Sequence, residues 1–159
     1  MEYRIETITE KKLVGHHMKM SLTDNKTRLL WQGFMPKKPL IRHVLGTDLY
    51  SLQILPPGYL THFNPATVFE KWAAVEVSDL EDMPEGMSSM VLPAGLYAVF
   101  LHKGPASAGP LSFQYIFGTW LPSSGYLLDD RPQFELLGAK YKNEDPNSEE
   151  EIWIPIKLA

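Results

Sequence analysis

Strand-like and helix-like segments alternate along the 159 residues of the chain. Alternation of apolar and polar residues, or a short apolar run between turn residues, predicts a strand, because successive side chains of a strand point to opposite faces. The segments with this pattern are residues 5–9, 13–20, 50–55, 69–77, 96–102, 134–137 and 151–156. The pattern therefore predicts a protein with many short strands.

Two segments instead carry apolar side chains at helical spacing. In the first, residues 23–24 are expected to cap a helix that ends near Pro36, with apolar positions at Leu29, Leu30, Trp31 and Phe34. In the second, residues 109–110 begin a helix and residues 122–125 end it. Its apolar stripe, which we interpret as core, consists of Phe113, Ile116, Phe117, Trp120 and Leu121.

The order strand, helix, strand, strand occurs twice, which predicts an α+β protein made of tandem duplicated βαββ modules. Residues 31–36 match residues 117–122 in their aromatic positions and final proline, and Glu70-Lys71-Trp72 matches Glu151-Ile152-Trp153. We expect one domain over residues 1–159, with a first repeat over about 1–78, a linker over about 79–87 and a second repeat over about 88–159. The alternative is a chance similarity between two amphipathic helices.

Composition excludes several classes of protein. The chain has no cysteine, which excludes a disulfide scaffold, a zinc ribbon and a thiol nucleophile. A net charge of −4 argues against nucleic acid as a direct partner. No apolar run approaches the ~20 residues of a membrane span, and the acidic, alternating N-terminus does not resemble a secretory signal. We expect a reducing, cytoplasmic compartment and no membrane partner.

The common catalytic motifs for nucleotide binding, zinc proteases and serine hydrolases are absent. The five histidines are scattered, and the adjacent His16 and His17 must point to opposite sides of a strand. We therefore expect no metal site and no cofactor.

Carboxylates and aromatic residues share predicted strand faces. In the last strand, Ile152, Ile154 and Ile156 should face the helices, which leaves Glu151 and Trp153 together on the opposite face. Glu70 and Trp72 share a face in the first half by the same alternation. A carboxylate beside an indole suits a lipophilic cation, since the aromatic face adds ~0.5–2 kcal/mol of attraction. The alternative is an exposed sheet face on which the indole covers a neighbour.

Glu135 and Tyr97 are further candidates. Glu135 lies between apolar neighbours, and a carboxylate removed from water has a raised pKa and needs a counter-ion or donor. Tyr97 lies in the middle of a strand, from which its hydroxyl could donate into the same groove. The alternatives are a solvent-facing Glu135 and a Tyr97 that is simply core.

Several segments of the second half resemble the GyrI-like, AraC-type effector-binding domain family. They are residues 84–87, 92–100, 102–105, 120–126 and 151–156, and the first half matches more weakly at residues 31–36 and 69–77. The resemblance implies two βαββ modules related by a pseudo-twofold axis, with antiparallel sheets, helices on one face and a ligand groove between the modules. It also implies a bulky, lipophilic and often cationic ligand, with Glu135 and Glu151 in positions that look like the family's pocket acids.

Many members of that family are sensors fused to a DNA-binding domain. Here residue 1 already begins the first strand, so we expect a stand-alone member without direct contact to nucleic acid. Our first hypothesis is a binding protein rather than an enzyme. Its ligand-contacting residues would be Glu135, Glu151, Trp153, Tyr97, Trp72, Trp31 and Tyr50.

Two other functions stay open. Some stand-alone members of the family resemble this chain in layout and are described as hydrolysing reactive cyclopropane-bearing natural products. Such a reaction would use Glu135, Glu151 and Tyr97. The family name also suggests a protein-interaction module that inhibits gyrase.

Overall fold

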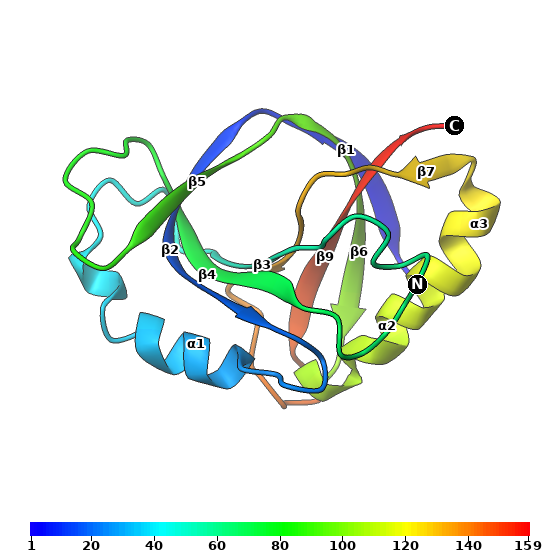
Figure 1. The fold of residues 1–159 in the computed structure, drawn as a ribbon, viewed down its shortest axis with the longest axis horizontal. Coiled ribbons are helices and arrows are strands. Elements are labelled where there is room, and N and C mark those ends of the chain that lie inside the picture. The colour runs from blue at the N-terminus through cyan, green and yellow to red at the C-terminus, as the bar shows by residue number, and fades with distance from the viewer.

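The computed structural model describes residues Met1–Ala159 and confirms the α+β class, with a nine-stranded, antiparallel sheet and helices on one of its faces (Figure 1). The strands are β1 (Tyr3–Ile8), β2 (Lys11–Met20), β3 (Leu49–Ile54), β4 (Phe69–Val77), β5 (Ser88–Leu92), β6 (Gly95–Lys103), β7 (Tyr126–Leu128), β8 (Gln133–Leu137) and β9 (Glu149–Leu158). The helical segments are α1 (Thr27–Phe34), η1 (Lys38–Leu40), η2 (Ala106–Ala108), α2 (Gly109–Tyr115), η3 (Ile116–Trp120, a π turn) and α3 (Leu121–Ser124).

The two halves of the chain have the same pairing pattern. In the first half β4 lies between β2 and β3, in the second half β9 lies between β6 and β8, and β3 pairs with β8 at the centre. The edge strands are exchanged, since β1 pairs with β6 and β5 pairs with β2. The sheet order is therefore β1-β6-β9-β8-β3-β4-β2-β5, with β7 added beside β9. Duplication as the origin of this arrangement stays a prediction.

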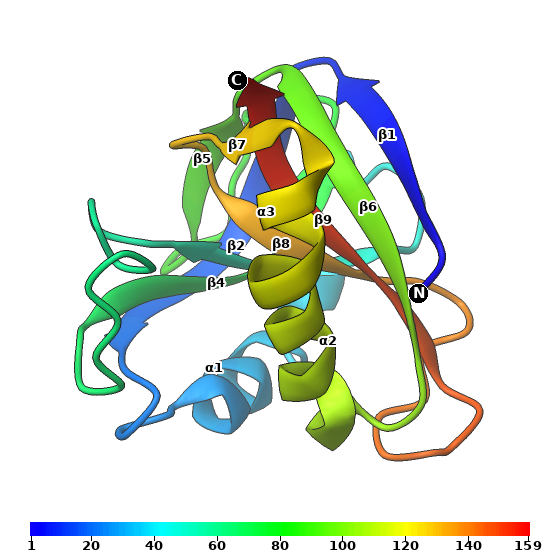
Figure 2. The ribbon, with the colours of Figure 1, turned by 90° about the vertical axis from the view of Figure 1, so that its right-hand side faces the viewer.

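Both helices cover the same face of the sheet, which we call the helix-bearing face (Figure 2). Helix α1 packs on β2 and β4 through a cluster that includes Leu30 and Phe34. Helix α2 and its continuation pack on β6 and β9 through Ile116 and Trp120. Ile152, Ile154 and Ile156 belong to this second cluster, as their alternation predicted. Neither cluster includes a buried residue of the central strands β3 and β8.

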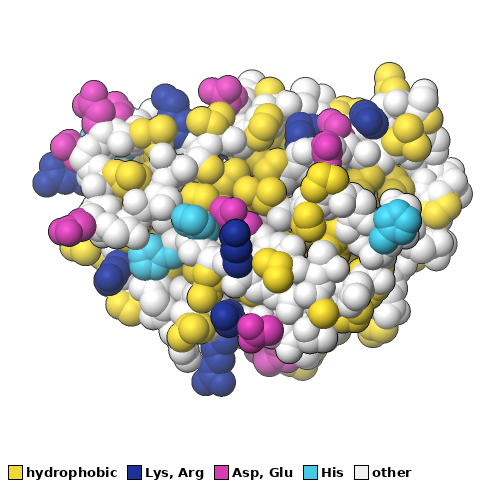
Figure 3. Space-filling view, viewed as in Figure 1, with side chains coloured by type: hydrophobic (Ala, Val, Ile, Leu, Met, Phe, Trp, Pro, Cys, Tyr) yellow, Lys and Arg dark blue, Asp and Glu magenta, His cyan; other side chains and the backbone are white.

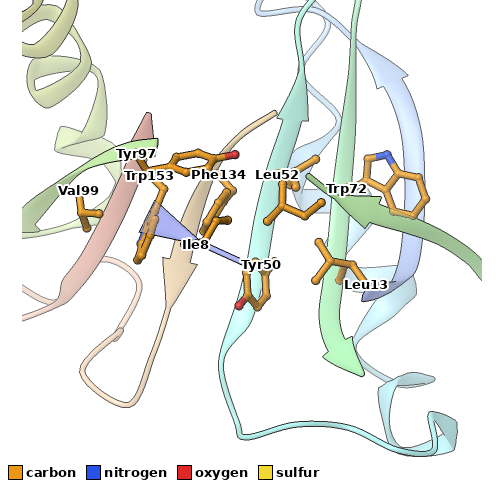
Figure 4. Close-up of a cluster of buried hydrophobic side chains, with 11 residues drawn as sticks. Ile8, Leu13, Tyr50, Leu52, Trp72, Tyr97, Val99, Phe134 and Trp153 are labelled. Carbon is orange, nitrogen blue, oxygen red and sulfur yellow. The ribbon is translucent and has the colours of Figure 1, made fainter. Parts of the chain in front are cut away.

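The opposite face of the sheet holds a third cluster, which we call the aromatic core (Figure 4). Its members are Ile8, Leu13, Tyr50, Leu52, Trp72, Ala74, Leu92, Tyr97, Val99, Phe134 and Trp153. Connections of two residues each join β1 to β2 and β5 to β6. Because β1 and β5 lie at the two ends of the sheet, these short connections bring its two edges toward each other around the aromatic core. Buried apolar surface of this extent is the main source of the fold's stability.

The helix termini differ in part from expectation. The prediction that residues 23–24 cap the first helix is wrong, because α1 begins at Thr27 and the backbone N–H of Asp24 donates to Ser21 Oγ in a preceding turn (3.0 Å). The second helix continues through Pro122 and ends at Ser124, where Gly125 adopts a φ of 81° that favours glycine. No helix is long and apolar enough to cross a bilayer.

Candidate functional site

The two Glu-x-Trp segments lie at equivalent places of the two halves, on β4 and β9. Each indole N–H donates to the carboxylate two residues before it, with 2.6 Å between Trp72 Nε1 and Glu70 Oε1 and 3.2 Å between Trp153 Nε1 and Glu151 Oε1. Both indoles belong to the aromatic core and expose only 4% and 7% of their surface. Each Glu and its Trp thus share the face that strand alternation predicted.

A basic side chain of the protein itself already lies beside each of these pairs. The His17 ring stacks on Trp72, with 4.5 Å between ring centroids, and its Nδ1 lies 3.3 Å from Glu70. In the other half, the guanidinium of Arg4 lies 5.7 Å from the Trp153 ring centroid, and its Nη1 lies 2.8 Å from Glu151.

The structure thus fills both predicted cation-binding positions with residues of the chain. The space-filling view shows hydrophobic side chains gathered across the middle of one surface, with acidic, basic and histidine side chains next to them (Figure 3).

Tyr97 and Tyr50 are also parts of the aromatic core (Figure 4). The Tyr97 hydroxyl donates to the Pro132 carbonyl oxygen at 2.8 Å, and the Arg131 guanidinium lies 4.8 Å from the centroid of its ring. Burial raises the pKa of Tyr97 to about 12, and burial together with nearby Glu76 and Asp48 raises the pKa of Tyr50. Both rings are packed among neighbours, so in this state they act as core residues.

Glu135 lies on the other side of the sheet from Glu151. Residues directly opposite each other on paired strands share a face, and Glu135 pairs with Ile152 while Leu136 pairs with Glu151. Because Ile152 packs under α2, Glu135 points to the helix-bearing face. The structure therefore does not bring the two predicted pocket acids together, and it also separates Glu135 from Tyr97.

Polar side chains from four neighbouring strands surround Glu135 at the centre of the helix-bearing face. This central polar cluster consists of Ser51, Gln53, Lys71, Gln133, Glu135 and Glu150. Five of the six are buried, and the partly exposed one is Glu135. Since a buried polar group needs a partner, a polar strip between two apolar clusters is a costly feature, and it is a candidate functional site.

The carboxyl group of Glu150 holds its proton at a higher pH than an ordinary glutamate. Burial and the adjacent Glu135 carboxyl raise the pKa of Glu150 to about 8. The Lys71 ammonium opposes that effect. Lys71 itself donates to Gln53 Oε1 at 2.7 Å, and burial lowers the pKa of its amine although both carboxyl groups favour the charged form. The cluster thus combines a proton donor, a carboxylate and an amine in a region with little water.

Two aromatic residues lie on the side of the sheet that carries this cluster. The pKa of Tyr141, in the loop before β9, is raised to about 12 by burial and by nearby Glu150 and Glu135. Trp31 on α1 is partly buried and packs edge-on against Phe34, with 5.8 Å between ring centroids. Of the seven predicted ligand-contacting residues, Trp31 and Glu135 belong to the helix-bearing side, and the other five belong to the opposite face.

Sequence reasoning missed Lys71, Glu150 and Gln53. Lys71 stands in the apolar run of β4 at a position that alternation assigns to the helix-bearing face, so its burial could have been found. Glu150 is the middle residue of a run of three glutamates, a pattern that is typical of a solvated segment. Its burial follows from its inward position on β9, whereas Glu149 and Glu151 on either side are partly exposed.

Two cavities lie elsewhere on the protein, and of the central polar cluster only Gln133 lines one of them. One, of about 140 Å³, lies between residues 54–61 and residues 128–133. The other, of about 380 Å³, is open and lies beside residues 1–2 and residues 101–112. No three acidic or histidine side chains converge in a way that could hold a metal ion.

Comparison with known proteins places this architecture in a family. Residues 1–157 match the family model of the GyrI-like small molecule binding domain. The transcriptional regulator BrlR of Pseudomonas aeruginosa is 31% identical over 129 residues, which are 80% of this chain and 45% of that regulator. The chain thus spans less than half the length of this curated relative.

Solved structures show the same fold at low sequence identity. The structure of SAV2435 bound to tetraphenylphosphonium has a TM-score of 0.75 and 18% identity, with 99% of this chain and 94% of that chain covered. The structure of a hydrolase encoded by lin2189 from Listeria innocua has a TM-score of 0.61 and 9% identity, with coverages of 98% and 92%. From the match over residues 1–157, the chain belongs to the family of GyrI-like small-molecule binding domains.

Proposed function

We propose that the protein binds a lipophilic organic cation on the helix-bearing face, with Glu135 and Glu150 as the counter-charge. The observation that carries the proposal is the carboxyl pair at the centre of the sheet, where the buried Glu150 holds a proton beside the partly exposed Glu135. An organic cation could replace that proton and keep the pair neutralised, which a neutral ligand could not do. The tetraphenylphosphonium in the structure of a similar fold is a ligand of this class.

The flanking helices fit a ligand with apolar surface. Trp31 on α1 and the stacked rings of Phe113 and Phe117, 6.2 Å apart on the other helix, are only partly buried. Aromatic side chains around a few polar groups are typical of small-molecule sites, and an aromatic face also attracts cations. Solvent reaches the cluster at Glu135, which gives a ligand an entry point.

The test compares a cation and a neutral molecule of similar shape, tetraphenylphosphonium and triphenylphosphine oxide, by titration calorimetry. Glu135→Gln should weaken tetraphenylphosphonium binding by about ten- to a hundredfold, because it removes a counter-charge of the bound cation. Binding of triphenylphosphine oxide should change little.

Glu151→Gln is the matched control, since Glu151 lies on the opposite face beside Arg4 and should not affect either ligand. Equal losses for both ligands, or an equal effect of the two variants, would contradict the proposed role.

A second candidate function is hydrolysis of a small molecule. A Glu150 that keeps a proton near neutral pH has the property of a general acid, and Tyr141 lies close to it. In this arrangement Glu150 and Tyr141 would take the roles that the sequence suggested for Glu151 and Tyr97. The two functions differ in turnover, because an enzyme converts more than one equivalent of ligand and a binding protein does not.

A further inference from the structure

Lys71 is a feature of the central polar cluster that a cation-binding site alone does not explain. Its side chain lies on the helix-bearing face of β4 and the residue exposes 8% of its surface. The amine donates to Gln53 Oε1 at 2.7 Å, and no other hydrogen-bond partner of Lys71 is present in the structure. An ammonium has three N–H donors, so this buried group has unused hydrogen-bonding capacity.

The charge of Lys71 also acts on the carboxyl pair. Glu135 and Glu150 are the two charged groups that stabilise its ammonium, although neither carboxylate forms an ion pair with it. The protein thus holds a positive charge of its own within the region where a cationic ligand would be bound. A ligand that carries only positive charge would be repelled by this ammonium in an environment with little screening.

We propose that Lys71 is a specificity-determining residue, which selects lipophilic cations that also carry a carboxylate or another strong hydrogen-bond acceptor. The cationic part of such a ligand faces Glu135 and Glu150, and its acceptor takes an N–H of Lys71. This inference rests on the proposed function and narrows its ligand class. It follows from the general rule that a site with a buried, unused donor rejects ligands that leave the donor unpaired.

The test uses two phosphonium ions that differ in one group, (4-carboxybutyl)triphenylphosphonium and pentyltriphenylphosphonium. The wild-type protein should bind the carboxylate form about tenfold more tightly, the usual effect of one hydrogen bond to a charged group. Lys71→Met should reverse this preference, because it removes both the donor and the repulsive charge. Lys19→Met is the control, since Lys19 is exposed on β2 and should leave the preference unchanged.

The possible results separate the two proposals. Binding of both phosphonium ions without preference for the carboxylate form, or an unchanged preference in Lys71→Met, would overturn the role of Lys71 and leave the cation site standing. Failure of both ions to bind the wild-type protein would overturn the proposed function together with this inference. If Lys71→Met does not fold, Lys71→Gln serves as the second variant. In the wild-type protein, the absence of a preference for the carboxylate form would by itself overturn the role of Lys71.

Discussion

The raised pKa of Glu150 makes the stability of the fold depend on pH in a defined direction. The pKa of this carboxyl is about 8 in the folded chain, against an ordinary value of 4.5 that applies when the chain is unfolded. Between these values the folded state holds a proton that the unfolded state has released. Raising the pH through this range therefore lowers the free energy of unfolding. The contribution of Glu150 to that free energy is most favourable below pH 4.5.

The size of the effect can be bounded. Each pKa unit corresponds to about 1.4 kcal/mol, so the difference between 4.5 and about 8 sets an upper limit of roughly 5 kcal/mol. Solvent reaches the pair at the partly exposed Glu135, and the Lys71 ammonium stabilises the ionised form. With these offsets we expect about 2 kcal/mol.

The assay is urea unfolding of the wild-type protein and Glu150→Gln at several pH values from 5 to 8. Glutamine imitates the protonated carboxyl, so the two proteins should be similar near pH 5 and the variant should be more stable by about 2 kcal/mol at pH 8. The difference between the two proteins cancels the contributions of all other titrating groups.

Glu149→Gln is the control, because Glu149 is partly exposed and lies 3.7 Å from Lys140. Parallel pH profiles for the wild type and Glu150→Gln would refute a proton held at this position.

Two further substitutions test the packing of the sheet. Gly15→Ala should destabilise the fold by about 3 kcal/mol in urea unfolding, because a Cβ at Gly15 would lie 1.9 Å from the Ala73 carbonyl oxygen. Gly33→Ala on α1 is the control: its Cβ would meet nothing closer than 3.9 Å, so the substitution should be neutral or slightly stabilising. Tyr97→Phe should lower the melting temperature by an amount equivalent to about 1 kcal/mol, since it leaves the Pro132 carbonyl oxygen without its donor. An unchanged melting temperature would show that this hydrogen bond does not contribute to stability.

Local patterns predicted the features that depend on one element at a time. The alternation of Ile152, Ile154 and Ile156 assigned them to the helices, and the spacing of Phe113 to Leu121 located the second helix, because both periodicities follow from the geometry of a single strand or helix. The pairing of each Trp with its Glu is equally local, since it joins residues two positions apart on one strand.

The composition of the site depends on the register between strands, which one sequence does not specify. Glu135 lies opposite Ile152, and a shift of one residue would have placed it on the face of Glu151. The basic partners of the two Glu-x-Trp pairs come from β1 and β2, so no local pattern could reveal them. Glu150 looks like a surface residue within its run of three glutamates, and only the neighbouring strands make it buried.

The exchange of β1 and β5 between the halves has a consequence for the order in which the chain folds during synthesis. Strand β1 leaves the ribosome before its partner β6, which begins only at Gly95. At the usual rate of about 5–20 residues per second, β1 waits for roughly 5 to 20 seconds without a partner. During that time its unpaired backbone groups and Ile8, which is buried in the complete fold, are available to other chains. A chain that stops before residue 95 never pairs them.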